Sequence, residues 1–291
     1  MQIIGHERVR NFLSSITADN FPHTLLITGP AGVGKTTVAL AAAAALIGCD
    51  ATRAETHPNI IRVTAGEDPK THTPRAAIPV AAIRELRSLF HIHHSEPRII
   101  LIERAEELQQ ESSNALLKVM EEPNTQIYFM ILARSDEAVL QTIKSRAAHI
   151  QLSNVPTGIL RAGLAARGFS SAEIDRAAAI AGGRPGVALR YLENAEFRER
   201  VITESTRFND LFRAKTLGAA EKILSDLFGK KERHIEVRKE LVEMLEWWMM
   251  WLSEKNPTHP AIAQIAKTIP LLSENMHPRL LVERIVIELQ S

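Results

Sequence analysis

The chain has 291 residues, 45% of them apolar and 24% charged, with a net charge of +1 and an isoelectric point near 8.0. This length predicts two or three domains, and the charge balance excludes a strongly basic chain that coats nucleic acid by charge alone. A single cysteine, Cys49, excludes an internal disulfide and is typical of a reducing compartment. The longest apolar run, residues 38–47, is too short to span a bilayer, and the start of the chain lacks a signal-peptide pattern. We therefore expect a cytoplasmic protein without membrane contact.

Short aliphatic runs alternate with helical stretches through the first half of the chain. The predicted strands are 24–28, 60–63, 99–102, 127–132 and 149–152, and the predicted helices between them include 35–47, 80–90 and 112–121. Three of the strands are continuously apolar, which is typical of a parallel sheet covered by helices on both faces. The alternation predicts a doubly wound α/β domain.

The pattern changes near Asn154, beyond which no strand is predicted. Helices are predicted instead, at 158–167, 171–181, 185–193 and, most clearly, 237–252. Ser170 and Glu173 provide a start signal for the second of these, and Gly182 a stop signal. The helix 237–252 has apolar side chains on two faces. Such a helix lies in the middle of a bundle or at a subunit interface, and core packing is the expectation.

A phosphate-binding motif lies between the first predicted strand and the helix that follows it. Residues 29–36, GPAGVGKT, match GxxxxGK[ST] in the required strand–loop–helix order. The motif contains three glycines, Gly29, Gly32 and Gly34. Glycines let the loop backbone turn its N–H groups toward phosphate, and the helix adds its N-terminal dipole. Lys35 can reach the β- and γ-phosphates, and the Thr36 hydroxyl can ligate Mg²⁺. The alternative is a chance match in a glycine-rich turn.

The strand 99–102 ends where many P-loop proteins carry two acidic residues. An Asp in the first position holds Mg²⁺ through water, and a Glu in the second activates the attacking water. Glu103 occupies the first position with a side chain one methylene longer, and we assign it a Mg²⁺-linked role. Arg104 occupies the second, and a guanidinium cannot accept a proton from water. Glu106 and Glu107 lie nearby, but neither has the expected position. The sequence predicts binding without efficient hydrolysis. The alternative is a strand end with solvated charges.

Several stretches together resemble the clamp-loader branch of the AAA+ ATPases. They are Ile4-Gly5-His6, Pro22-His23, NALLKVMEEP at 114–123 and TIKSRA at 142–147. His57-Pro58-Asn59 and Ile83-Arg84-Glu85-Leu86 also look like the delta-prime family of bacterial DNA polymerase III. The resemblance covers residues 1 to about 152 well and weakens beyond them.

This resemblance implies an α/β fold with three parts. Residues 1–152 are expected to form an AAA+ P-loop NTPase domain with a parallel five-stranded sheet. Residues 153–195 are expected to form a small helical lid domain, and residues 196–291 a C-terminal helical collar domain that assembles with other subunits.

The resemblance also implies roles for two arginines. Arg146 occupies the position of an arginine finger, which projects into a neighbouring subunit's ATP site and stabilises charge on the γ-phosphate. Arg184 maps onto a position that contacts the γ-phosphate of the chain's own nucleotide, although a helix end with a trailing arginine explains it equally well. A small polar residue that senses the nucleotide is expected after strand 127–132, where Arg134 and Ser135 both lie.

A structural zinc site is not expected. Relatives commonly carry a four-cysteine zinc module after the P-loop helix, whereas this chain has only Cys49 in that stretch. Histidines do occur nearby, at positions 57, 72, 91, 93 and 94. His91, His93 and His94 are expected to lie in a polar loop before strand 99–102.

The leading hypothesis is a delta-prime-like clamp-loader subunit that binds ATP or ADP with Mg²⁺ and hydrolyses it weakly. It would lend Arg146 to a neighbour and join other loader subunits in a hetero-oligomer that loads the sliding clamp on primer–template DNA. One alternative is the ATP-hydrolysing gamma/tau-type motor subunit. Arg104 and the short C-terminal part argue against it. Another is a P-loop small-molecule kinase or transferase, which would leave Arg146 and the 114–123 helix unexplained.

Overall fold

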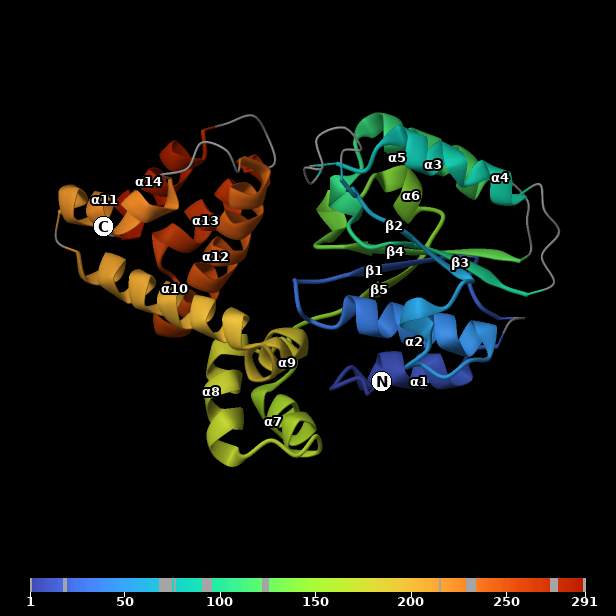
Figure 1. Ribbon diagram of the computed structural model, residues 1–291, viewed down its shortest axis with the longest axis horizontal. Coiled ribbons are helices and arrows are strands. Elements are labelled where there is room, and N and C mark those ends of the chain that lie inside the picture. Colours follow the sequence, from blue (N-terminus) through green and yellow to red (C-terminus); the bar gives the residue numbers. More distant parts are fainter. Residues whose placement is uncertain are drawn as a thin grey trace. The chain divides into compact units, whose positions relative to one another are not determined.

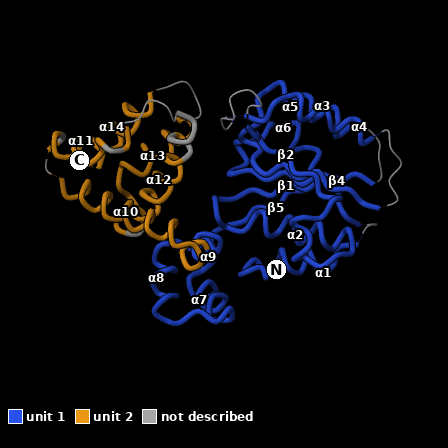
Figure 2. The backbone as a smooth tube through the Cα atoms, viewed as in Figure 1, with its two compact units in different colours: residues 1–189 blue, residues 190–291 orange. Residues whose placement is uncertain are grey.

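The computed structural model describes residues 2–17, 20–67, 75, 77–90, 96–121, 126–214, 216–228, 234–272 and 277–289. The chain divides into two compact units, residues 1–189 and residues 190–291 (Figure 2). Among the described helices, none has both the length and the apolar character that crossing a bilayer requires.

The first unit is built around a parallel sheet of five strands. These are β1 (Thr24–Thr28), β2 (Ile60–Val63), β3 (Arg98–Ile102), β4 (Ile127–Ala133) and β5 (Ala148–Gln151), in the order β2-β3-β4-β1-β5. Every pairing is parallel, so the carboxyl ends of all five strands meet at one edge of the sheet. The predicted sheet is confirmed, with strand bounds that differ from the prediction by no more than one residue.

Helices cover both faces of this sheet (Figure 1). One face carries α1 (Glu7–Ser15) and α2 (Lys35–Ile47), and the other carries α3 (Val80–Glu85), α4 (Arg87–Phe90), α5 (Gln110–Met120) and α6 (Gln141–Lys144). The burial of strand β4 on both faces explains why its sequence is apolar throughout. Met130 and Leu132 belong to the core on the α2 side, whereas Phe129 and Ile131 belong to the core on the α5 side. Burying both faces of a strand requires apolar residues at every position rather than at alternate ones.

The helix predicted over 80–90 is divided into α3 and α4. The Leu86 N–H donates to the Ile83 carbonyl, and the Leu89 N–H donates to the Leu86 carbonyl, at 3.3 and 3.0 Å. These bonds span three residues rather than four, which tightens the helix and breaks its regular path. Leu86 is buried at this point, and its packing against the core accompanies the break.

Three short helices follow β5, as predicted, and complete the first unit. They are α7 (Thr157–Ala165), α8 (Ser171–Ala181) and α9 (Pro185–Glu193), the last of which continues across the unit boundary. The predicted cap of α8 is present: the Glu173 carboxylate accepts from the Ser170 N–H and hydroxyl, at 2.9 and 2.6 Å. Gly182 ends the helix in the left-handed conformation, with a φ of 53°.

Helices are the only regular elements in the described part of the second unit. It contains α10 (Ala195–Arg213), α11 (Leu217–Leu224), α12 (His234–Lys255), α13 (Pro260–Leu271) and α14 (Pro278–Leu289). The two apolar faces predicted for 237–252 lie in its core, where Trp247 and Trp248 are fully buried. Phe208 of α10 packs against Trp248 and Trp251, with ring centroids 6.0 and 5.7 Å apart. Core packing therefore explains this helix.

Candidate nucleotide site

The phosphate loop lies at the carboxyl edge of the sheet, between β1 and α2. Gly29, Gly32 and Gly34 have φ values of 147°, 78° and 112°, a region that residues with a side chain rarely adopt. Space also requires glycine at the first position, because a Cβ on Gly29 would lie 2.3 Å from the Leu152 carbonyl oxygen. The loop therefore has a conformation that this glycine pattern permits and most other sequences do not.

Side-chain nitrogens of Lys35 and His6 hold several of the loop's carbonyl groups. The Lys35 Nζ donates to the carbonyls of Gly29 and Pro30, at 2.6 and 3.0 Å. The Val33 carbonyl lies 3.2 Å from the His6 Nε2, which donates in the tautomer that carries its proton there. Each peptide plane points its carbonyl and the next residue's N–H in opposite directions. Holding these carbonyls therefore favours a loop whose N–H groups face an anion.

Helix α2 begins directly after the loop, with Gly34 at its N-cap. Thr36 lies half-buried in the first turn, where its hydroxyl can ligate a Mg²⁺ ion that accompanies phosphate. Val38 and Leu40 of the same helix are buried in the core below. The helix that supplies the N-terminal dipole is thus fixed against the sheet, and the predicted residues of the loop lie together at its start.

The helical segment after β5 packs directly against the loop. The Gly186 N–H donates to the Gly32 carbonyl at 2.7 Å. A Cβ on Gly32 would lie 2.6 Å from the Val187 Cγ2, and a Cβ on Gly186 would lie 2.9 Å from the Gly32 carbonyl oxygen. Two glycines thus allow backbone to meet backbone. The sequence pointed to Arg184 but not to a role for Gly186, because a contact between two glycines leaves no signature in either stretch alone.

The N-terminal segment also contacts the phosphate loop, through His6. His6 has a left-handed φ of 54°, the single such value outside glycine in the described residues. This conformation costs on the order of 1 kcal/mol for a residue with a side chain, and here it accompanies the contact with Val33. The same segment packs on α7, where a Cβ on Gly163 would lie 2.6 Å from the Ile4 Cγ2. Residues 4–6 therefore connect α7 to the phosphate loop.

The acidic residues after β3 are each paired with an arginine. Glu103 accepts a hydrogen bond from the Arg62 Nε of β2 at 2.6 Å. Glu107 lies 3.0 Å from Arg104, the residue in the position expected for a general base. Glu106 lies 3.2 Å from Arg134, which follows β4. Positive charge therefore neutralises the carboxylates on which a hydrolytic site at this edge would depend.

The loop after β4 is held by polar contacts that the sequence did not predict. The Thr28 hydroxyl donates to the Asp136 Oδ1 at 2.9 Å, and the His149 Nε2 lies 2.8 Å from the same hydroxyl oxygen. The Ser135 hydroxyl donates to Glu137 and lowers the pKa of that carboxyl. Both candidates for the polar position after β4, Arg134 and Ser135, are thus engaged with carboxylates of their own chain.

The two arginines assigned by resemblance have different surroundings. Arg146 follows α6 and is half-exposed, with its Nη2 2.8 Å from the Glu121 Oε1 and its Nη1 3.1 Å from the Thr142 carbonyl. Arg184 is buried, and its Nε donates to the Ala181 carbonyl at the end of α8. The contact at Ala181 fits the explanation of a helix end with a trailing arginine.

In the described part of the chain, no group of three or more histidine, cysteine or acidic side chains could hold a metal ion. His72, His91, His93 and His94 lie outside the described residues, as does Pro123, the predicted end of the 114–123 helix. For these histidines the expectation from sequence remains a prediction.

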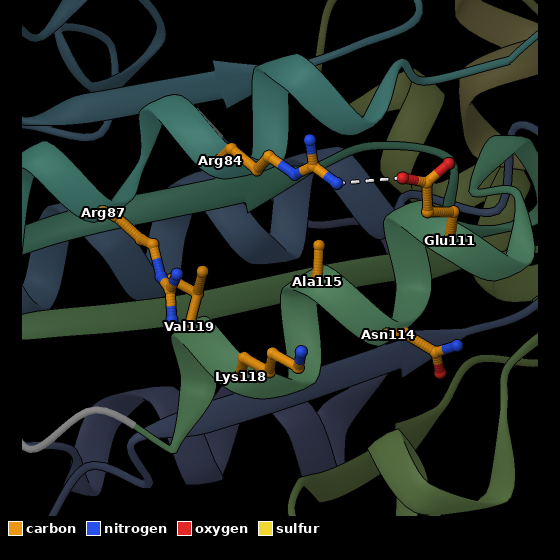
Figure 3. A pocket seen from close by; sticks show the side chains of 7 residues that line it. All are labelled: Arg84, Arg87, Glu111, Asn114, Ala115, Lys118 and Val119. Atoms are coloured by element: carbon orange, nitrogen blue, oxygen red, sulfur yellow. Dashed lines mark hydrogen bonds and ion pairs between the residues drawn. The ribbon is translucent and has the colours of Figure 1, made fainter.

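A basic hollow of about 170 Å³ lies on the other face of the sheet, between α3, α4 and α5 (Figure 3). Its lining residues are Arg84, Arg87, Glu111, Asn114, Ala115, Lys118 and Val119. Arg84 donates to Glu111 at 2.9 Å, and Lys118 projects from α5 in the same view. Three cations against one carboxylate make this hollow positively charged.

These features define an AAA+ P-loop ATPase fold: a parallel sheet in the order β2-β3-β4-β1-β5, a phosphate loop after β1, and a helical segment packed on that loop. The fold matches the structure of a DNA polymerase III gamma subunit-related protein of Thermotoga maritima, with a TM-score of 0.53 over 98% of each chain. At 15% identity this likeness concerns the fold alone. Residues 5–156 match the family described as DNA polymerase III, delta subunit, and the chain belongs to that family.

Curated relatives are clamp-loader proteins of several kinds. The chain is 29% identical to the replication factor C small subunit of Methanocella arvoryzae, over 55% of this chain and 48% of that one. It is 31% identical to the DNA polymerase III subunit delta' of Haemophilus influenzae, over 42% and 38%. It is 28% identical to the gamma/tau subunit of Mycobacterium bovis, over 56% and 30%. The alignments span about half or less of these relatives' lengths. They confirm the resemblance to clamp loaders.

Proposed function

We propose that this chain is a delta-prime-like subunit of a bacterial clamp loader, cytoplasmic, that binds ATP or ADP and hydrolyses it weakly or not at all. One observation carries the proposal. The phosphate loop carries three glycines with positive φ and is followed at once by Lys35 and Thr36, whereas the carboxylates after β3 are paired with arginines. A site of this kind retains the groups that bind phosphate and lacks the group that activates water.

The weak hydrolysis follows from the chemistry of Glu103 and Arg104. A positioned general base contributes roughly 10²- to 10⁴-fold to a reaction rate, and a guanidinium cannot supply it. Glu103 shares its carboxylate with Arg62, whose positive charge opposes a nearby Mg²⁺ and makes the proposed link to the metal weaker than that of an unpaired carboxylate. Thr36 would then be the main protein ligand to Mg²⁺, with nucleotide phosphates and water completing its coordination.

Arg184 belongs to the nucleotide-binding set in a secondary role. Its backbone precedes Gly186, which bonds to the loop, and its side chain is buried against the end of α8. Its main role in the proposal is to keep the turn between α8 and α9 packed against the phosphate loop. The Ala181 carbonyl engages Nε, so the proposed contact with the γ-phosphate falls to the Nη groups of the same guanidinium.

Arg146 acts on a neighbouring subunit in this proposal. It lies at the surface after α6, half-exposed, and a guanidinium of that kind can enter a partner's nucleotide site. An arginine supplied in trans accelerates phosphoryl transfer by roughly 10³- to 10⁵-fold. The chain then contributes more to its neighbour's chemistry than to its own.

The proposed partners are the other clamp-loader subunits, the sliding clamp and primer–template DNA. The collar role is assigned to residues 196–291 and the lid role to residues 153–195. The basic hollow lined by Arg84, Arg87 and Lys118 is the proposed contact with DNA phosphates. Contacts of that kind are independent of sequence and weaken as salt rises.

Nucleotide binding and turnover, measured for the isolated chain and for the loader reconstituted with its partner subunits, test this function. We expect binding that Lys35→Ala abolishes, turnover near background in the isolated chain, and a loss of loader turnover with Arg146→Ala. Arg161→Ala is a matched control, because Arg161 is a similarly exposed arginine paired with Asp175. Rapid turnover by the isolated chain would favour the gamma/tau-type motor. Failure to join the other subunits would favour a small-molecule kinase or transferase.

A further inference from the structure

Arg146 is held on its own subunit by Glu121, at the end of α5, and by the Thr142 carbonyl and the Ser145 hydroxyl near α6. Its Nη2 lies 2.8 Å from the Glu121 Oε1, and its Nη1 donates to the Thr142 carbonyl at 3.1 Å. Its backbone N–H donates to the Ile143 carbonyl, which fixes the turn after α6. The guanidinium therefore has a defined place before any neighbour is present.

Glu121 is well placed to set the direction of that side chain. It is the C-cap residue of α5, whose inner face is anchored in the core by Leu116 and Val119. Its carboxylate consequently projects from the end of a helix that is packed in the core, 25 residues away in sequence from the arginine it contacts. A long arginine side chain has many rotamers in solution, and a fixed carboxylate selects among them.

The ion pair between Arg146 and Glu121 is weak enough to orient the arginine without preventing it from leaving. The side chain of Arg146 is 45% exposed and that of Glu121 is 54% exposed. Ion pairs with this exposure favour the paired state by only about 1.4- to 5-fold. The triphosphate of a neighbouring subunit carries several negative charges, so it can attract the guanidinium without having to break a strong bond.

We propose that Glu121 is a positioning residue for Arg146, which it holds in the orientation that meets the nucleotide of a neighbouring subunit. The inference rests on the proposed role of Arg146 as an arginine finger. Glu121 contacts neither the nucleotide of its own subunit nor that of the neighbour. It acts by reducing the number of orientations that the Arg146 side chain samples before it meets the nucleotide.

Single-turnover ATP hydrolysis at the neighbouring site, in the loader reconstituted with this full chain, tests the proposal. We expect Glu121→Gln to lower the maximal rate by about 1.4- to 5-fold, the range of an exposed pair, with little change in the ATP concentration at half-maximal rate. The effect should shrink as salt is raised, because the pair that is lost is screened. A structural defect has no reason to follow salt in this way.

Two further variants make the outcome decisive. Glu121→Gln in an Arg146→Ala background should change nothing, since the effect of Glu121 passes through Arg146. Asp175→Asn, which breaks the exposed pair between Asp175 and Arg161, is the matched control and should leave the rate unchanged.

The possible failures are distinguishable. If Arg146→Ala leaves the neighbouring site at the wild-type rate, the proposed arginine finger is wrong. If Arg146→Ala lowers the rate and Glu121→Gln does not, the finger stands and the positioning role of Glu121 is wrong. A rate that rises with Glu121→Gln also overturns the proposal, because Glu121 would then restrain Arg146 rather than position it.

Discussion

Gly186→Ala separates nucleotide binding from folding, because the contact it changes lies between the phosphate loop and α9. The added Cβ would lie 2.9 Å from the Gly32 carbonyl oxygen and 3.3 Å from the Gly32 Cα. The first distance is shorter than a methyl group tolerates, and both atoms belong to the backbone. Helix α9 must therefore move away from the loop by a few tenths of an ångström.

Two opposing effects determine how far Gly186→Ala changes the folding free energy. Replacing glycine by alanine in a helix ordinarily stabilises it by about 0.5–1 kcal/mol. Against this, the bond from the Gly186 N–H to the Gly32 carbonyl, now 2.7 Å long, is stretched or lost. A bond of that kind contributes about 0.5–1.5 kcal/mol, so the net change in folding free energy should be close to zero. The loop loses the contact that holds its Gly32 carbonyl, and nucleotide binding should weaken by about 2- to 12-fold.

Titration with ATP and ADP, alongside thermal unfolding, measures both quantities. Gly158→Ala is the matched control: Gly158 lies on α7 in the same helical segment, and a Cβ there would meet nothing within 4 Å. It should stabilise the protein by up to about 1 kcal/mol and leave the affinity unchanged. Wild-type affinity in Gly186→Ala would refute the idea that α9 holds the loop in its binding conformation.

Three further predictions follow from the same contacts. Lys35→Ala should abolish nucleotide binding in a titration while circular dichroism shows an intact fold, because its Nζ holds the Gly29 and Pro30 carbonyls and reaches the phosphates. Arg62→Ala should make nucleotide affinity more dependent on Mg²⁺, since it releases Glu103 to bind the ion; unchanged Mg²⁺ dependence would argue against a role for Glu103. Burial raises the pKa of Glu204, so the folded form binds that proton more tightly than the unfolded form. Stability of the second unit should then fall as pH rises through the interval from the ordinary carboxyl pKa to the raised one, and Glu204→Gln should flatten this slope. Denaturant unfolding followed by tryptophan fluorescence measures this pH dependence of stability, since all three tryptophans lie on α12.

The sequence predicted the sheet and the phosphate loop well because both depend on local patterns. A strand buried on both faces must be apolar at every position, as β4 is, and a loop that cradles phosphate needs glycines at fixed spacing. Neither inference requires knowing what lies across the fold. The capping signal at Ser170 and Glu173 was equally local and was confirmed.

The contacts that refine the site could not be predicted because they join distant parts of the chain. Arg62 and Glu103 come from different strands, and Glu121 and Arg146 from different helix ends. Charged residues at strand and helix ends are usually solvated, so nothing in the sequence marks Arg62 as the partner of Glu103 or Glu121 as the partner of Arg146. The break after α3 was missed for a related reason: Leu86 packs into the core, and this tertiary contact accompanies a local change in helix geometry.

The central claim is that the chain's chemical contribution is made through Arg146 to a neighbour, while its own phosphate loop serves binding. The most direct test compares the ATP turnover of the reconstituted loader carrying either Arg146→Ala or Lys35→Ala in this chain alone. The proposed function predicts a large loss of turnover with Arg146→Ala and a small one with Lys35→Ala. The reverse order, with Lys35→Ala abolishing turnover and Arg146→Ala sparing it, would contradict the claim.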